Sequence, residues 1–249
     1  MKNCLIITNQ NFYDLVNING LLNYIKDKYD IINLVVRKNI YEHSYFILRL
    51  IGNINLIIVD DDINLNEINI DFHDMDKILL GDYNKNIINN FNINNPLINY
   101  FAIFYDQLNL DYNIKFEYEH IERDFKSEDY YYNKLLSKLK NGYIFYYNKF
   151  DNFILDDSKK FIFNPLYNYY ENDEYKKNNW INLQYNYIFD LSKIIENAYE
   201  IHIFDIDIFS IMPYLNLNNV KNKYIYNNNI RIKEYHKNLN DFIFIYHEN

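Results

Sequence analysis

The chain has 249 residues, of which 49% are apolar, and a formal charge of −9 at pH 7. This acidic balance argues against a general nucleic-acid-binding protein, which needs a basic surface to displace counterions. A single cysteine, Cys4, excludes an internal disulfide and argues against a cysteine-based metal site. The sequence lacks a signal peptide and an apolar run of about 18 residues, so we expect a soluble cytoplasmic protein without a membrane span.

The first hundred residues alternate between strand-like and helix-like patterns. Apolar runs flanked by polar residues predict buried strands at residues 4–8, 31–36, 54–59 and 78–80. Apolar residues at steps of three and four predict helices at residues 12–29 and 41–50. Strands that alternate with helices in this way imply βαβ units and a parallel sheet.

The rest of the chain starts with helical patterns and then returns to the same alternation. Helices are predicted at residues 97–108, 130–139, 187–199 and 208–215, with Ser127 as the N-cap of the second of these. Strands are predicted at residues 143–147, 161–163, 201–204, 223–226 and 242–246. We therefore predict an α/β protein with two Rossmann-like halves, 1–105 and 106–249, whose parallel sheets face one cleft.

Ligands of parallel α/β sheets bind beyond the carboxyl ends of the strands. In this sequence, those ends are followed by the segments 9–14, 60–62, 148–149 and 205–210, each of which contains polar residues. None of these segments carries the glycine-rich fingerprint of a dinucleotide-binding fold or a phosphate loop. The nucleophile elbow of α/β-hydrolases is also absent from the sequence, so these three classes are disfavoured.

Two further features leave alternatives open. Asp60 and Asp62 follow a buried strand and could hold Mn²⁺ or Mg²⁺ against a diphosphate, although an acidic pair at a strand end is more often simply solvated. Phe204-Asp205-Ile206-Asp207 repeats this pattern. The six histidines lack the spacing of metal ligands, and His202 is either a core residue or one that points into the cleft. We predict no bound metal.

One segment of the first half carries a family resemblance. Residues 12–22, FYDLVNINGLL, resemble the first helix of heptosyltransferase-like GT-B glycosyltransferases. In that family a Gly-Asp pair opens the helix, and its aspartate can act as general base on the acceptor hydroxyl. The resemblance implies this role for Asp14 and an acceptor-side function for residues 1–105. Tyr13 replaces the family glycine, which places a bulky side chain where a close backbone contact is expected.

The second half is similar to glycosyltransferase-like proteins of large DNA viruses and bacteria. The segments that carry this resemblance are 104–110, 122–128, 142–145 and 190–205. It implies that residues 106–249 bind a nucleotide-sugar donor, with no other cofactor, and that a viral protein would work in the host cytoplasm. The implied donor-binding residues are Arg123, Asn148, Lys149, Asp205, Asp207 and Ser210.

The resemblance implies transfer of a sugar from a nucleotide-sugar to a glycan or another acceptor hydroxyl. The donor segment departs from the family, because Ile206 and Asp207 stand where small or hydroxylated residues hold the diphosphate. The carboxylate of Asp207 would repel a pyrophosphate. The alternative is therefore a non-catalytic structural or interaction protein derived from a glycosyltransferase fold. The sequence leaves the sugar, the acceptor and the oligomeric state open.

Overall fold

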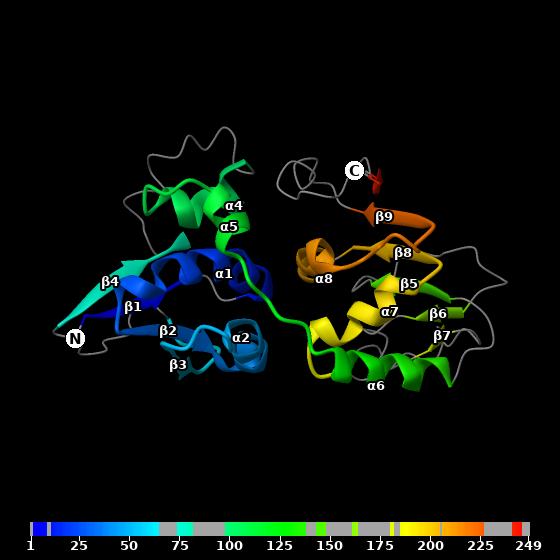
Figure 1. Cartoon of the computed structure of the whole chain (residues 1–249), viewed down its shortest axis with the longest axis horizontal. Helices are drawn as coiled ribbons and strands as arrows, with labels where there is room; N and C mark the ends of the chain where they lie inside the picture. Colours follow the sequence, from blue (N-terminus) through cyan, green and yellow to red (C-terminus); the bar gives the residue numbers. More distant parts are fainter. Residues whose placement is uncertain are drawn as a thin grey trace. The chain divides into compact units, whose positions relative to one another are not determined.

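A computed structural model describes residues 2–8, 11–64, 74–81, 98–137, 143–147, 161–163, 180–181, 185–204, 206–226 and 241–245. The chain divides into two compact units, Met1–Glu122 and Arg123–Asn249. Each unit is built on a parallel sheet that carries helices (Figure 1). The predicted α/β class with parallel strands is confirmed. None of the helices in the described residues has both the length and the apolar character needed to cross a bilayer.

The first unit contains a four-stranded sheet with the order β3-β2-β1-β4. Its strands are β1 (Asn3–Ile7), β2 (Ile31–Arg37), β3 (Ile54–Val59) and β4 (Met75–Leu79). Its helices are α1 (Phe12–Ile25), η1 (Lys26–Lys28), η2 (Lys38–Ile40), α2 (Tyr41–Leu48), α4 (Ile98–Asp106) and α5 (Asn113–Tyr118). Leu5, Ile7 and Val35 form a buried cluster on one face of this sheet, so alternation along β1 places Cys4 and Ile6 on the other face.

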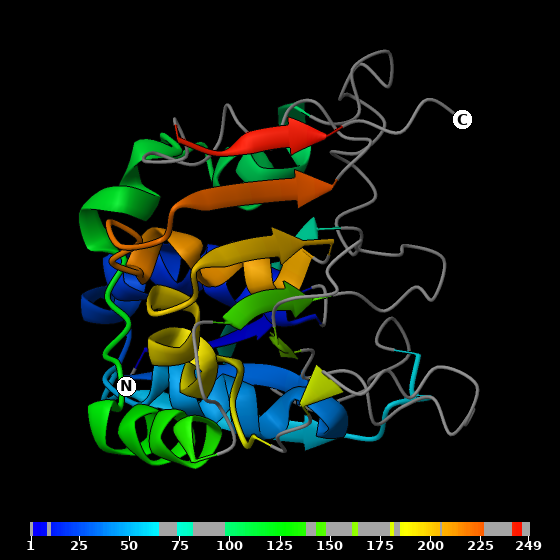
Figure 2. The same ribbon diagram turned by 90° about the vertical axis from the view of Figure 1, so that its right-hand side faces the viewer.

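The second unit contains a six-stranded sheet with the order β10-β9-β8-β5-β6-β7. Its strands are β5 (Tyr143–Tyr147), β6 (Phe161–Phe163), β7 (Trp180–Ile181), β8 (Glu200–Ile203), β9 (Asn222–Tyr226) and β10 (Ile243–Ile245). Its helices are α6 (Phe125–Leu136), η7 (Ile188–Leu191), α7 (Ser192–Glu196), α8 (Ile206–Ile211) and η8 (Met212–Tyr214). Figure 2 shows the strands pointing the same way, so their carboxyl ends share one edge.

The structure divides the chain later than the sequence patterns suggested. The predicted boundary between residues 105 and 106 would cut α4, but the compact first unit continues to Glu122. The reason is that α4 and α5 pack on α1: the Tyr105 hydroxyl donates to the carbonyl of Asn17 at 2.8 Å. Helix α5, which the sequence analysis missed, lies against α1 at Gly20.

Two helix boundaries in the second unit also differ from the predicted ones. The N-cap of α6 is Asp124, whose carboxylate accepts the N–H groups of Lys126 and Ser127, both at 3.1 Å. The hydroxyl of Ser127 instead donates to Asp190 at 2.6 Å. The helix predicted at residues 187–199 is shorter and consists of η7 followed by α7. Both differences arise because Asp190 is a buried acceptor that receives hydrogen bonds from two separate segments.

Candidate functional site

The expected general base, Asp14, lies in the first turn of α1, just beyond the carboxyl end of β1. The side chain of Asn11 caps this helix by accepting the Asp14 N–H at 2.8 Å, and an acidic residue here complements the positive end of the helix. The residue is 0% exposed, and the adjacent Tyr13 is 2% exposed. Both side chains are therefore covered in this structure, and Tyr13 is part of the core of the first unit.

Arg123, expected to offset the donor diphosphate, lies between two glutamates. Its guanidinium donates to Glu128 at 2.8 and 2.6 Å, to Glu196 at 2.5 and 3.0 Å, and to the carbonyl of Tyr214 at 3.3 Å. These carboxylates raise the pKa of Arg123 although burial acts to lower it. A diphosphate would have to compete with two charge-assisted pairs for this side chain.

The position of these partners in the fold places Arg123 away from the carboxyl ends of the strands. Glu196 ends α7, shortly before β8 begins, and Tyr214 ends η8, before β9 begins. The carboxylate of Glu196 also accepts the N–H of Asn216 at 2.7 Å. Arg123 therefore joins the start of α6 to segments near the amino ends of β8 and β9. Its donor-binding role stays a prediction.

The structure brings two of the predicted donor-binding residues together in α8. The Ser210 hydroxyl is buried and donates to the carbonyl of Asp207, one turn earlier, at 2.6 Å. Asp207 is half-buried in the first turn of this helix, which follows β8. Ser210 thus makes a local hydrogen bond within the helix. Asn148, Lys149 and Asp205 lie outside the described residues.

The acidic residues after β3 are exposed to solvent. The Asp61 carboxylate accepts the N–H of Asn39 at 3.0 Å, and its carbonyl accepts a hydrogen bond from Arg37. Asp60 and Asp62 flank it and are also exposed. In the part of the chain that the structure describes, no three His, Cys, Asp or Glu residues form a group that could hold a metal ion.

His202 lies in the core of the second unit. One ring nitrogen is 2.8 Å from the hydroxyl of Tyr226, the other is 2.7 Å from Glu200, and the residue is 3% exposed. Asn222 donates to the other oxygen of Glu200 at 2.7 Å. Of the two alternatives for His202, this geometry supports the core residue. The sequence pattern does not indicate its partner on β9, because it does not specify that the neighbours of β8 in the sheet are β5 and β9.

Aromatic rings surround this hydrogen-bonded group on the same face of the sheet. The ring of His202 stacks on Tyr224, with centroids 4.7 Å apart, and Tyr226 stacks on Phe204 at 4.1 Å. Phe204 and Tyr226 lie at the carboxyl ends of β8 and β9, where ligands of parallel sheets bind. Stacked rings are a suitable surface for a nucleobase, and the alternation of aromatic residues in 224–226 is the sequence signal for them.

The chain shows similarity to known proteins in its structure but not in its sequence. No protein-family model matches the sequence, and the comparison with curated proteins gives no match. Among solved structures, the chain is similar to a glycosyl transferase family 9 protein from Veillonella parvula, with a TM-score of 0.56 and 10% sequence identity. The similarity covers 100% of this chain and 88% of that protein. At this identity it concerns the fold, which this chain shares with a glycosyltransferase.

Proposed function

We propose that the protein is a glycosyltransferase of the GT-B type, which moves a sugar from a nucleotide-sugar to an acceptor hydroxyl. The observation that carries this proposal is the fold: the similarity to a family 9 glycosyl transferase extends over the whole chain. The presence of two α/β units, each with a parallel sheet, agrees with a two-domain transferase in which one unit binds the acceptor and the other the donor.

The proposed reaction is a displacement at the anomeric carbon. The acceptor oxygen attacks this carbon, the bond from the carbon to the donor phosphate breaks, and the nucleoside diphosphate leaves. Asp14 accepts the proton of the acceptor hydroxyl. Asn148, Lys149, Asp205 and Ser210 form the donor site, and the cationic Lys149 offsets the charge of the leaving diphosphate, with Arg123 assisting if it is released from its glutamates.

The burial of Asp14 sets a condition on this mechanism. A general base must lie within about 3 Å of the hydroxyl that it deprotonates, and Asp14 is fully covered. Residues at the start of α1 must therefore move when the acceptor binds. Catalytic hydrogen bonds often form only in the complex, so this condition is compatible with transfer.

The first test is nucleotide binding. We expect one of UDP, GDP, CDP, dTDP or ADP at 100 times its Kd to stabilise the protein by about 2.7 kcal/mol, which corresponds to a rise in Tm of roughly 5–10 °C. If none of the five changes the Tm, the proposal fails. Transfer itself is then tested with Asp14→Asn, which preserves the shape of the side chain and should lower kcat by roughly 100-fold or more. Asp27→Asn is the matched control, because it makes the same chemical change at an exposed position just after the other end of α1.

A second candidate is a non-catalytic protein that retains the fold. Two observations favour it. The expected base, Asp14, is buried, and the first turn of α8 carries the acidic Asp207. For this candidate, nucleoside diphosphates leave the Tm unchanged, and Asp14→Asn preserves the biological role. Loss of sugar transfer by a folded Asp14→Asn variant contradicts it.

A further inference from the structure

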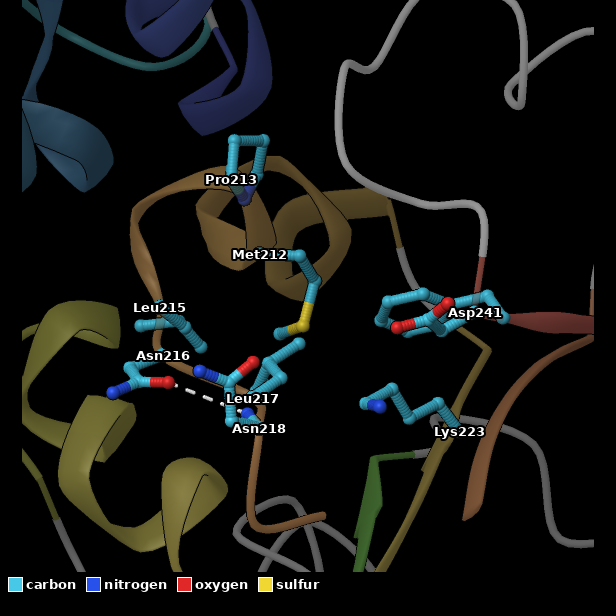
Figure 3. A pocket seen from close by; sticks show the side chains of 9 residues that line it. Met212, Pro213, Leu215, Asn216, Leu217, Asn218, Lys223 and Asp241 are labelled. Carbon is cyan, nitrogen blue, oxygen red and sulfur yellow. Dashed lines mark hydrogen bonds between the residues drawn. The ribbon is translucent and has the colours of Figure 1, made fainter. Parts of the chain in front are cut away.

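The second unit contains a pocket of about 440 Å³ that the proposed reaction does not use. One wall is formed by η8 and the segment that follows it, with Met212, Leu217, Asn216 and Asn218. The opposite wall is formed by the starts of β9 and β10 (Figure 3). Its volume falls within the range of about 300–1,000 Å³ that is typical of small-molecule sites.

The pocket lies at the amino ends of the strands. Lys223 is the second residue of β9, and Phe242 immediately precedes β10. The proposed donor site is at the carboxyl ends of strands in the same sheet, so the two places are at opposite edges. A ligand of this pocket is therefore a second ligand, whose binding does not depend on the proposed transferase activity.

The pocket carries one charge of each sign. In the parallel register Ile243 pairs with Tyr224, so the preceding residues, Phe242 and Lys223, lie next to each other at the amino ends of the two strands. Asp241 comes one residue earlier, and Figure 3 shows Asp241 and Lys223 on the same side of the pocket. Among the residues that the structure describes, Lys223 and Asp241 form no ion pair with each other. The ammonium and the carboxylate thus give this side of the pocket a donor and an acceptor.

Apolar side chains lie opposite these charges. Figure 3 shows Met212 and Leu217 across the pocket from Lys223, and Leu215 and Pro213 also line the pocket. The segment that carries Leu217 is ordered by its own hydrogen bond, because the side chain of Asn216 accepts the N–H of Asn218 at 3.3 Å. The wall that would receive an apolar group is therefore formed before a ligand arrives.

We propose that this pocket binds a free α-amino acid with a large apolar side chain. The carboxylate of the amino acid pairs with Lys223, its ammonium pairs with Asp241, and its side chain packs on Met212 and Leu217. A simple anion would meet the carboxylate of Asp241, and a simple cation would meet the ammonium of Lys223. Only a ligand that carries both charges at one end satisfies both groups.

Three probes with the same ring test this proposal: L-phenylalanine, 3-phenylpropanoate, which lacks the ammonium, and 2-phenylethylamine, which lacks the carboxylate. Binding to the full chain is measured by isothermal titration calorimetry. We expect L-phenylalanine to bind at least about 10-fold more tightly than either analogue, since each analogue leaves one charge unmatched. Equal affinity for all three probes overturns the proposal. The proposal is also overturned if L-phenylalanine does not bind at ~10 mM, with the ligand at about 10 times the protein concentration or more.

Variants of Lys223 and Asp241 are expected to weaken the binding of one probe and to strengthen the binding of another. Lys223→Met and Asp241→Asn should each weaken the binding of L-phenylalanine by about 10-fold or more. Asp241→Asn should also strengthen the binding of 3-phenylpropanoate, because it removes the repulsion of its carboxylate. A misfolded variant cannot gain affinity, so this gain separates ligand contact from a loss of structure. Lys221→Met, two residues from Lys223 and outside the pocket, is the matched control and should bind all three probes as the wild type does.

Discussion

The two units hold their helices by different chemistry. In the first unit, α1 is fixed by close approach and by hydrogen bonds of neutral groups. The backbone of Lys115 in α5 lies against Gly20, and the Tyr105 hydroxyl accepts the N–H of Leu21 at 3.2 Å while donating to the carbonyl of Asn17. The Lys115 side chain is the exception in this unit: burial lowers its pKa, and Glu119 at 3.9 Å acts in the opposite direction.

In the second unit, α6 and α7 are joined by charged groups. Arg123 pairs with Glu128 near the start of α6 and with Glu196 at the end of α7. Burial raises the pKa of Glu128, and the guanidinium of Arg123 acts against that shift. On the surface, Lys193 pairs with Asp129. Close packing tolerates no added atoms, whereas a buried ion pair tolerates no loss of a partner, so the two units should respond to different substitutions.

The sequence provides a separate reporter for each unit. Cys4 is the single cysteine and lies in β1, and Trp180 is the single tryptophan and lies in β7. Labelling of Cys4 by a thiol reagent in urea therefore follows the opening of the first unit. Trp180 fluorescence follows the unfolding of the second unit.

The largest effect is expected for Arg123→Met. The substitution retains most of the aliphatic stem but leaves the carboxylate of Glu128, whose side chain is 1% exposed, without its counter-ion. We expect the second unit to lose about 3 kcal/mol of unfolding free energy, measured from Trp180 fluorescence. Adding Glu128→Gln should recover part of this loss.

Two observations would contradict the view that buried ion pairs support the second unit alone. One is an unchanged Trp180 midpoint in Arg123→Met, and the other is an equal shift of the Cys4 midpoint, which would mean that the ion pairs support both units. Lys193→Met is the matched control, because it breaks the exposed pair with Asp129. Exposed pairs contribute little, so its Trp180 midpoint should equal that of the wild type.

Gly20→Ala should produce the next largest effect, confined to the first unit. A Cβ atom at this position would lie 2.5 Å from the carbonyl oxygen of Lys115 and 2.8 Å from its Cα, so α5 would have to move. The higher helix propensity of alanine stabilises the helix by up to about 1 kcal/mol, whereas overpacking destabilises the unit by about 1–3 kcal/mol. We expect a net loss of about 1–2 kcal/mol in the Cys4 signal.

The chain offers a matched control for this substitution. At Gly52 an added Cβ meets nothing within 4 Å, so Gly52→Ala should leave the Cys4 midpoint within about 0.5 kcal/mol of the wild type. Stabilisation of the first unit by Gly20→Ala would show that α5 does not lie against α1.

A smaller loss is expected for Tyr105→Phe. The hydroxyl bridges the Leu21 N–H and the Asn17 carbonyl, and burial raises the pKa of Tyr105, so the phenol stays a neutral donor. Leu21 and Asn17 are four residues apart in α1, so the helix also pairs these two groups, and the hydroxyl adds a contact from α4 to them. Its removal should cost about 1 kcal/mol in the Cys4 signal, the net contribution of a buried hydrogen bond. No change in that midpoint would mean that the hydroxyl does not help to hold α4 on α1.

The smallest effect is the pH dependence of the first unit. Burial, assisted by Asp76 and opposed by Lys2, raises the pKa of Cys4 from 9.0 to about 12. A raised pKa of a thiol means that its contribution is fully present below pH 9 and is lost as the pH rises toward 12. We therefore expect a slight fall in the Cys4 midpoint between pH 8 and pH 9, and labelling without urea at least about a thousandfold slower than in the denatured chain. Rapid labelling at pH 8 would contradict the burial of β1.

Strand positions were predictable from the sequence because a strand buried on both faces requires a continuous apolar run. The segment Tyr143–Tyr147 was predicted with the bounds that the structure has, and all five of its residues are buried. Ile54–Val59 was also predicted with its bounds, but its predicted burial is wrong: β3 is an edge strand, and Ile58 is 50% exposed. Helix ends were less predictable, because several residues compete for one cap. Asp124 and Ser127 are both good N-cap residues, and the buried Asp190 decides between them by accepting the Ser127 hydroxyl.

The apolar and polar pattern by itself determined the α/β class and the parallel strands. The composition determined the acidic charge and the single cysteine. Tertiary structure decided what pairs with what. It placed Arg123 between Glu128 and Glu196, His202 between Glu200 and Tyr226, and Lys223 on the wall of a pocket. The physical reason is that periodicity is a local property, set by which face of an element is buried. The partner of a charged or polar side chain depends on sheet order and helix docking, which bring together residues far apart in the sequence.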